Sequence, residues 1–136
     1  KCNEMDNKKP FLKWLKPGKR TYSWGDTKER IFKLSHKIKS LINEGDRCLI
    51  LSENRPYWLM SDIAVMNAGG ISVPIFTTYS SNDYKYILND CKPSLIIVSN
   101  NEHLSGKIFK IFTIGNFFKF TFVKFHAFPL IAWAIF

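Results

Sequence analysis

Three helix-like segments alternate with three strand-like segments in the middle of the chain, and this alternation constrains the fold more than any other feature. Apolar residues recur at helical spacing over residues 31–42, 56–68 and 81–90. Short, continuously apolar runs of buried-strand length occupy residues 47–52, 71–76 and 94–99. Short turns separate all of them. This order predicts an α/β fold with a partial parallel sheet and right-handed βαβ crossovers.

Turn and cap residues set the expected boundaries of the first two helices. Trp24–Thr27 is expected to precede the first helix, and Gly45–Asp46 to end it and turn the chain. Asn54 is expected to cap the second helix, because Pro56 suits a first helical turn. Gly69–Gly70 is expected to stop that helix.

Three further features refine this picture. The second helix is apolar nearly all round, which predicts that it is covered on more than one side. Ser80–Asp83 is expected to cap the third helix, which Pro93 stops. Pro74 places the strand over residues 71–76 at a strand end or a sheet edge, because proline has no N–H for the ladder.

Charge and composition divide the chain into three parts. The 136 residues carry a formal net charge of +9, but residues 21–104 hold nine basic and nine acidic residues and are neutral. The excess lies in a basic leading segment, residues 1–20, and in residues 105–136, which contain four Lys and no acid. A neutral centre is a poor footprint for a nucleic-acid-binding fold, so we expect no nucleic-acid partner.

Residues 105–136 differ in character from the rest. They contain nine of the twelve Phe residues, with Lys interspersed and no stable helical or strand period. We expect an irregular tail outside the domain, which is assigned to residues 21–104. The bias towards Phe, Lys and Ile is typical of AT-rich DNA read in a wrong frame. That origin, and a front that is cut as well, are expectations.

The cysteines and the apolar runs bear on location. Cys2, Cys48 and Cys91 are odd in number and form no C-x-x-C pair, which favours a reducing cytosol over a disulfide framework. No signal-peptide core opens the chain, and its longest apolar run is shorter than a membrane-spanning helix requires. We therefore expect a cytoplasmic protein, with peripheral membrane contact as an open alternative.

A search for reactive groups finds no catalytic, cofactor-binding or metal-binding residue to assign. Gly69–Gly70 has no phosphate-binding Lys at the spacing of a P-loop, so we interpret it as a helix stop. His36, His103 and His126 lie far from other ligand residues, and His36 is expected on a helix surface. No G-x-S-x-G elbow is present.

Four positions or segments are candidates for chemistry or ligand contact. Glu53 and Asp62 could act as a carboxylate pair, but we expect Glu53 to support a helix N-terminus and Asp62 to lie on an exposed helix face or contact a neighbouring layer. Trp58 could stack on a ligand and is expected in the core. Thr77–Tyr79 follows a strand, where open α/β sheets bind ligands. It is the one segment suspected of substrate contact, although a plain loop is the favoured interpretation.

A series of linked motifs resembles the start of the AMP-forming acyl-CoA synthetases, and most closely their long-chain fatty-acid ligases. The motifs follow the family's order along residues 18–104. They are Thr21–Trp24, Gly45–Arg47, Ser52–Pro56 with Trp58, Pro74–Thr78 and Tyr86–Asp90. Tyr57 departs from the Glu often found there.

The resemblance implies a two-step ligase. A carboxylate and ATP give an acyl-adenylate and pyrophosphate, and CoA then displaces AMP to give the thioester. ATP, Mg²⁺ and CoA are thereby implied for a complete enzyme, with a fatty acid or another carboxylate as substrate. The family's phosphate loop, adenine-binding and Mg²⁺-binding motifs and late lysine do not occur here. The resemblance therefore implies a scaffold fragment that binds no cofactor and is inactive alone.

Two other functions stay open. A non-catalytic α/β binding module would unfold cooperatively as a monodisperse species, whereas a fragment of a large domain would aggregate through uncovered apolar surfaces. A basic, aromatic tail on a scaffold relic would bind anionic membranes in a salt-dependent way. Acyl chain length and oligomeric state do not follow from the sequence.

Overall fold

The computed structural model describes residues 7–15, 20–99 and 121–124, the last four by their backbone alone. The predicted alternation of helices and strands is confirmed. The elements are β1 (Pro10–Trp14), β2 (Arg20–Ser23), α1 (Trp24–Lys39), β3 (Arg47–Leu51), α2 (Pro56–Asn67), β4 (Ile71–Ile75), α3 (Ser81–Cys91), β5 (Leu95–Val98) and β6 (Thr121–Lys124).

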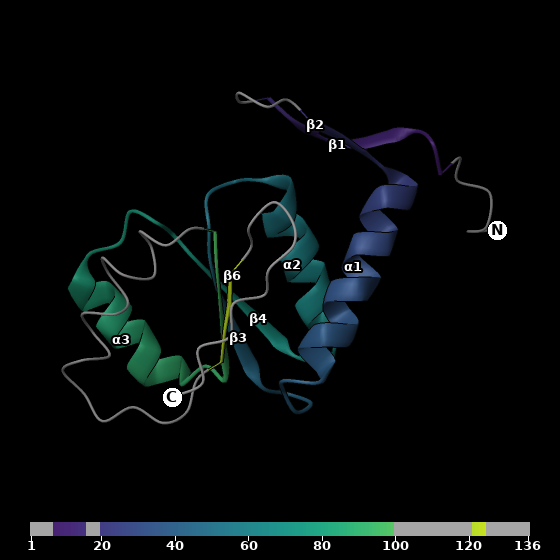
Figure 1. Cartoon of the computed structure of the whole chain (residues 1–136). Helices are drawn as coiled ribbons and strands as arrows, with labels where there is room; N and C mark the ends of the chain where they lie inside the picture. The colour runs from purple at the N-terminus through teal and green to yellow at the C-terminus, as the bar shows by residue number, and fades with distance from the viewer. Residues whose placement is uncertain (1–6, 16–19, 100–120, 125–136) are drawn as a thin grey trace.

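The main sheet has the strand order β4-β3-β5-β6, and all its neighbouring pairs are parallel. Figure 1 shows α1 and α2 on one face of this sheet and α3 on the other. The connection from β3 to β4 runs through α2, and the connection from β4 back across β3 to β5 runs through α3. The predicted parallel sheet with helical crossovers is therefore confirmed.

The central strands are buried on both sides, and their alternate side chains build two cores. Side chains of a strand point alternately to opposite faces, so neighbouring residues of β3 and β5 enter different cores. The core under α3 contains Leu49, Leu51, Ile75, Tyr84, Leu88, Cys91, Ile96 and Val98. The core under α2 contains Ile38, Cys48, Ile50, Ala64, Val65, Ala68, Leu95 and Ile97.

Helix α2 lies between the sheet and α1 (Figure 1). Its buried residues include Met60, Ala64 and Val65. The apolar face predicted for the first helix packs against the same core through Ile31 and Leu34, among others. The expectation that the second helix is covered on more than one side is confirmed, and a helix with two covered sides needs no polar stripe.

The predicted start of the first helix is wrong, whereas the second and third helices begin at the predicted residues, Pro56 and Ser81. Helix α1 begins at Trp24, because Ser23 and Asp26 form a capping box. Helix α2 is capped by Arg55 and not by Asn54, since Pro56 occupies the first helical position and holds its predecessor extended at φ −134° and ψ 158°. Helix α3 starts as predicted, after Ser80.

The helix ends show a similar mixture. Helix α1 ends at Lys39, before the predicted stop at Gly45–Asp46, and Ser40 donates its hydroxyl to the carbonyl of Lys37 at 2.7 Å. Gly69 follows the end of α2 with a φ of +90°, as its predicted role as a helix stop requires. Pro74 lies in β4, an edge strand among those described, which confirms its predicted position.

Strands also form in the basic leading segment, where no strand was predicted, and in the tail that was predicted to be irregular. Pro10–Trp14 of the leading segment pairs antiparallel with β2, and Phe11 stacks on Trp24 with ring centroids 3.6 Å apart. The Lys-rich composition hid this strand. Thr121–Lys124 forms β6 beside β5, so the prediction of a tail wholly outside the sheet is wrong for these residues. The free side of β5 offers backbone groups, and Thr, Phe and Val favour strands. The domain boundaries stay predictions.

Candidate functional site

The order of strands along the main sheet reverses at β3 and β5. The chain moves from β3 to β4 in one direction, then crosses back over β3 to reach β5 on its other side. Open α/β sheets bind ligands in the crevice outside the carboxyl ends of the strands at such a reversal. The carboxyl ends of β3 and β5 are therefore the first place to look for a site.

A small hollow lies at this place. Its walls come from the ends of β3 and β5 and from the start of α2. The residues that line it are Ile50, Ser52, Arg55, Tyr57, Trp58, Ser61, Ile97, Val98 and Ser99. Its volume is about 30 Å³. A site for a whole drug-sized ligand usually has about 300–1,000 Å³, so this hollow has room for only one small chemical group.

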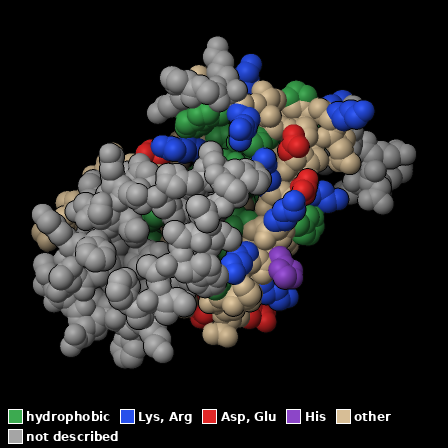
Figure 2. Space-filling view, in the orientation of Figure 1, with side chains coloured by type: hydrophobic (Ala, Val, Ile, Leu, Met, Phe, Trp, Pro, Cys, Tyr) green, Lys and Arg blue, Asp and Glu red, His purple; other side chains and the backbone are tan. Residues whose placement is uncertain are grey.

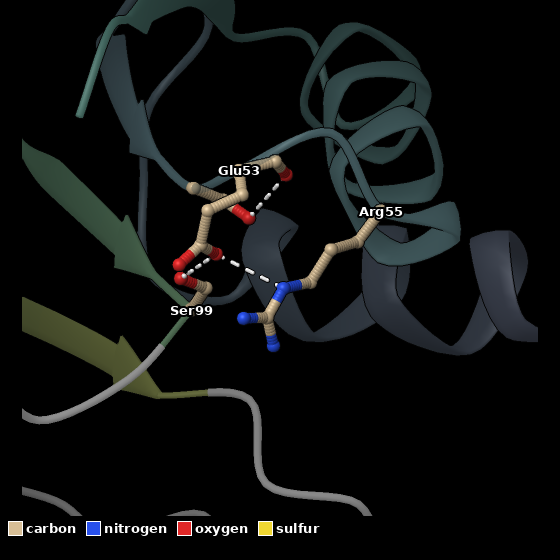
Figure 3. Close-up of polar contacts among 4 residues, drawn as sticks. Glu53, Arg55 and Ser99 are labelled. Atoms are coloured by element: carbon tan, nitrogen blue, oxygen red, sulfur yellow. Dashed lines mark hydrogen bonds and ion pairs between the residues drawn. The ribbon is translucent and has the colours of Figure 1, made fainter. Parts of the chain in front are cut away.

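Three polar residues from two strand ends meet beside the hollow (Figure 3). The hydroxyl of Ser99 donates to Oε2 of Glu53 at 2.8 Å. The same oxygen lies 2.9 Å from Nε of Arg55. The backbone N–H of Ser99 also donates to the carbonyl of Leu51 at 3.2 Å. These contacts tie the end of β5 to the loop that leads from β3 to α2.

The guanidinium of Arg55 makes an ion pair there but no hydrogen bond with the described residues. Its Nε is buried, and the N–H is not aligned with the Glu53 oxygen despite the short distance. Figure 3 shows the contact with Glu53 running to Nε of Arg55, with no contact drawn to its two terminal nitrogens. The Arg55 Cζ lies 5.5 Å from the centroid of the Trp14 ring, a cation–π contact that holds the side chain in place.

The start of α2 adds positive potential to the hollow. Its N-cap, Arg55, provides no side-chain hydrogen bond, and its first turn contains no acidic residue. The N-terminus of a helix carries a partial positive charge from its unpaired N–H groups. Ser61, inside the helix, donates its hydroxyl to the carbonyl of Tyr57 at 2.6 Å and is already paired. The site thus combines an arginine, a helix start and one carboxylate.

The suspected substrate loop, Thr77–Tyr79, lies elsewhere and does not line the hollow. An aromatic cluster organises it after β4. The Tyr84 hydroxyl donates to the carbonyl of Phe76 at 2.8 Å, and the ring of Tyr79 lies 5.4 Å from that of Phe76, edge to face. The structure therefore shows a loop packed on α3. Its contact with a substrate stays a prediction.

The structure separates the two carboxylates that were considered as a pair. Asp62 accepts a hydrogen bond from Ser72 of β4 at 2.6 Å, which confirms a polar contact to a neighbouring layer. Glu53 precedes α2 and pairs with Arg55, the N-cap residue of that helix; its support of the helix N-terminus stays a prediction. Trp58 is half-buried; it packs against the core and also lines the hollow.

Other candidates take ordinary positions. His36 is exposed on α1, as predicted. Among the described residues no group of three His, Cys, Asp or Glu could hold a metal ion, and no described helix is long and apolar enough to cross a membrane. Cys2, His103 and His126 lie outside the described residues. Figure 2 shows basic and acidic side chains interspersed beside α1.

Sequence reasoning named Glu53 and Trp58 but missed Arg55 and Ser99. Both missed residues follow predicted strands closely, and that was the available signal. The sequence did not show that β3 and β5 are neighbours, because residues 52–94 separate them. Only the strand order brings Ser99 within 2.8 Å of Glu53.

Known proteins are similar to this chain mainly over its central region. The family model described as AMP-binding enzyme matches residues 2–113. Fatty acyl-CoA synthetase A of Dictyostelium discoideum is 33% identical over 88 residues, which are 61% of this chain and 13% of that protein. Long-chain-fatty-acid–CoA ligase ACSBG1 of Rattus norvegicus is 40% identical over 62 residues, which are 46% of this chain and 8% of that protein.

Solved structures agree on the fold. The anthranilate CoA ligase AuaEII, crystallised with anthranoyl-AMP, superposes with a TM-score of 0.76 at 22% identity. The superposition covers 91% of this chain and 23% of that one. The chain therefore spans a small part of the length of the relatives it matches.

Proposed function

The chain belongs to the AMP-binding enzyme family, and we propose that it forms the first α/β unit of an AMP-forming fatty-acid–CoA ligase. One observation supports this most: the family match runs over residues 2–113, and curated relatives with 33% and 40% identity carry fatty acyl-CoA synthetase and long-chain ligase names. The linked motifs of residues 18–104 lie within the same region.

In the proposed complete enzyme, a carboxylate oxygen of the fatty acid attacks the α-phosphorus of ATP, and pyrophosphate leaves. The sulfur of CoA then attacks the acyl carbon, and AMP leaves with the electrons of the broken bond. Groups that stabilise the developing charge accelerate such steps. We assign none of them to the described residues; their part is to form a sheet and helices on which the remaining enzyme is built.

A segment exchange tests this proposal. The segment of the Dictyostelium discoideum synthetase that aligns with this chain is replaced by the matching residues of the chain. The expected chimera releases AMP in the presence of ATP, CoA and a fatty acid. A second chimera carrying Ile50→Asp serves as control, because a charge in the buried centre of β3 prevents folding.

A soluble, folded chimera without ligase activity would contradict the proposal. The 136-residue chain alone is expected to support no exchange of pyrophosphate into ATP. Exchange by that chain would show that it holds catalytic groups of its own. An inactive chimera would show that the chain does not replace the ligase segment, and an active chain would show that it is an enzyme by itself. The two measurements together therefore distinguish a scaffold from an enzyme.

Location and membrane contact are further proposals. We propose a cytoplasmic enzyme, supported by the odd, scattered cysteines, of which Cys48 and Cys91 are free and buried. Peripheral membrane contact through residues 105–136 is tested by binding of that peptide to anionic liposomes. Binding that falls with salt supports contact, and no binding at low salt excludes it.

A further inference from the structure

We propose that the hollow between the ends of β3 and β5 binds one oxyanion group, a carboxylate or a phosphate, through Arg55 and the start of α2. The site lies within this chain, and the inference does not rest on the proposed ligase activity. It begins from the topology: the strand order reverses at β3 and β5, and the hollow lies at their carboxyl ends.

The guanidinium of Arg55 has hydrogen-bond donors that the described residues do not use. A guanidinium has five N–H donors, and that of Arg55 makes no hydrogen bond with the described residues. Its side chain is only 34% exposed. Of its nitrogens, Nε is buried and has no hydrogen-bond partner in the part of the chain that the structure describes, and buried donors without partners are uncommon in folded proteins and call for a bound group or water. Arginine binds carboxylates and phosphates through two parallel N–H bonds, and Figure 3 draws no contact to either terminal nitrogen of Arg55.

The side chain of Arg55 is fixed in its orientation by contacts on two sides. Glu53 holds Nε of Arg55 and the hydroxyl of Ser99, and the ring of Trp14 lies against the guanidinium. An arginine held on two sides loses little conformational entropy when it binds an anion. The carboxylate of Glu53 also opposes a second negative charge. The arrangement therefore favours an anion that approaches from the side away from Glu53.

Size and chemistry define the ligand. The hollow measures about 30 Å³, and by this measure one water needs about 10–15 Å³. Two or three oxygens of one oxyanion fit, whereas a nucleotide or an acyl chain does not. The uncapped start of α2, without an acidic first turn, favours negative charge at the same point. The hydroxyls of Ser52 and Ser99 also line the hollow, but each already donates its proton to an oxygen of Glu53, so the donors for the anion are those of Arg55 and the start of α2.

Titration of the full chain with sodium acetate and with inorganic phosphate tests the site. Ionic strength is kept constant with chloride, and tryptophan fluorescence is followed because Trp58 lines the hollow and Trp14 lies on Arg55. Saturable binding of one of the two anions is expected and identifies the ligand chemistry. The absence of saturable binding of both would overturn the proposal.

Paired variants distinguish a binding residue from a structural one. Arg55→Gln is expected to weaken binding by at least about tenfold. Glu53→Gln is expected to tighten it by roughly threefold, because it removes the repelling charge. Lys85→Gln, which removes an exposed charge on α3, is the control and is expected to change the apparent Kd by less than about twofold. A merely structural ion pair would instead make both partner variants weaken binding alike, and that result would refute the site.

A milder variant guards against loss of folding. Arg55→Lys keeps the charge but loses the planar, two-pronged donor set. It is expected to fold and to bind the anion more weakly than the unchanged chain. Unchanged affinity in a folded Arg55→Lys variant would count against recognition by the guanidinium.

Discussion

Replacement of Thr27 by Val should make the protein more stable. Thr27 lies in the first turns of α1 and is 2% exposed. Its hydroxyl is buried and has no hydrogen-bond partner among the residues that the structure describes. A buried hydroxyl without a partner costs about 1–3 kcal/mol, because it loses its bonds to water and gains none. Valine has the same branched shape without the polar atom, so the packing is preserved.

We expect the free energy of unfolding to rise by about 1 kcal/mol, at the low end of that cost. With a urea dependence of about 2 kcal/mol per molar, the midpoint of unfolding rises by about 0.5 M. The assay is urea unfolding followed by tryptophan fluorescence in dilute solution. Dilution limits association through exposed apolar residues such as Phe32 and Ile71, which are 56% and 50% exposed.

A hydroxyl that is equally buried but bonded provides the control. Tyr84 is fully buried, and its hydroxyl donates to the carbonyl of Phe76 at 2.8 Å. Tyr84→Phe should therefore lower the free energy of unfolding by about 1 kcal/mol. The two variants remove one hydroxyl each and change stability in opposite directions. Equal losses of stability in Thr27→Val and Tyr84→Phe would refute the reasoning, since both hydroxyls would then be satisfied.

Three other substitutions or treatments follow from single contacts. Gly69→Ala should lower the free energy of unfolding by about 1–2 kcal/mol, because the φ of +90° at this position strains any residue with a Cβ. The urea midpoint should fall accordingly, and an unchanged midpoint would contradict this. Burial raises the pKa of the Cys48 thiol to about 12. A thiol reagent at pH 8 should therefore modify Cys48 only as fast as the protein unfolds. Rapid modification of Cys48 in the folded chain would refute its burial. Hydrogen bonds from the side chain and backbone of Ser80 hold the pKa of Asp83 below its ordinary 3.8. Asp83 therefore stabilises the fold above pH 3.8, and this effect is lost as the pH falls through its lower folded pKa. The difference in stability between Asp83→Asn and the unchanged chain should shrink on acidification. A difference that stays constant would exclude a contribution from the capping charge.

The sequence predicted the elements because their signals are local. Buried strands read as continuous apolar runs, and Ser80 with Asp83 is a capping pattern visible within four residues. The N-cap of α2 was predicted one residue too early, because Asn54 looks like a cap, whereas the proline constrains only its immediate predecessor, Arg55. Strand β1 was missed because its proline and the lysines in and around it outweighed its two aromatic residues in composition.

The site was less predictable than the fold. A loop after any strand is a fair candidate for ligand contact, and Thr77–Tyr79 satisfied that rule. Which strand end lies at the reversal depends on strand order, which is a long-range property. Glu53 and Ser99 are 46 residues apart and meet only in the folded sheet. The unused donors of Arg55 are also visible only when its neighbours are known.

The position of α2 between the sheet and α1 matters for anyone who wishes to engineer this unit. A helix that is covered on two sides has little surface on which charges can be added for solubility, and in α2 the exposed positions are at its end, where Met66 is 54% exposed. The useful positions for such redesign are the exposed apolar residues Phe32 and Ile71, on α1 and β4. Polar replacements there leave both cores intact, whereas the same replacements in α2 would separate the two layers that it joins.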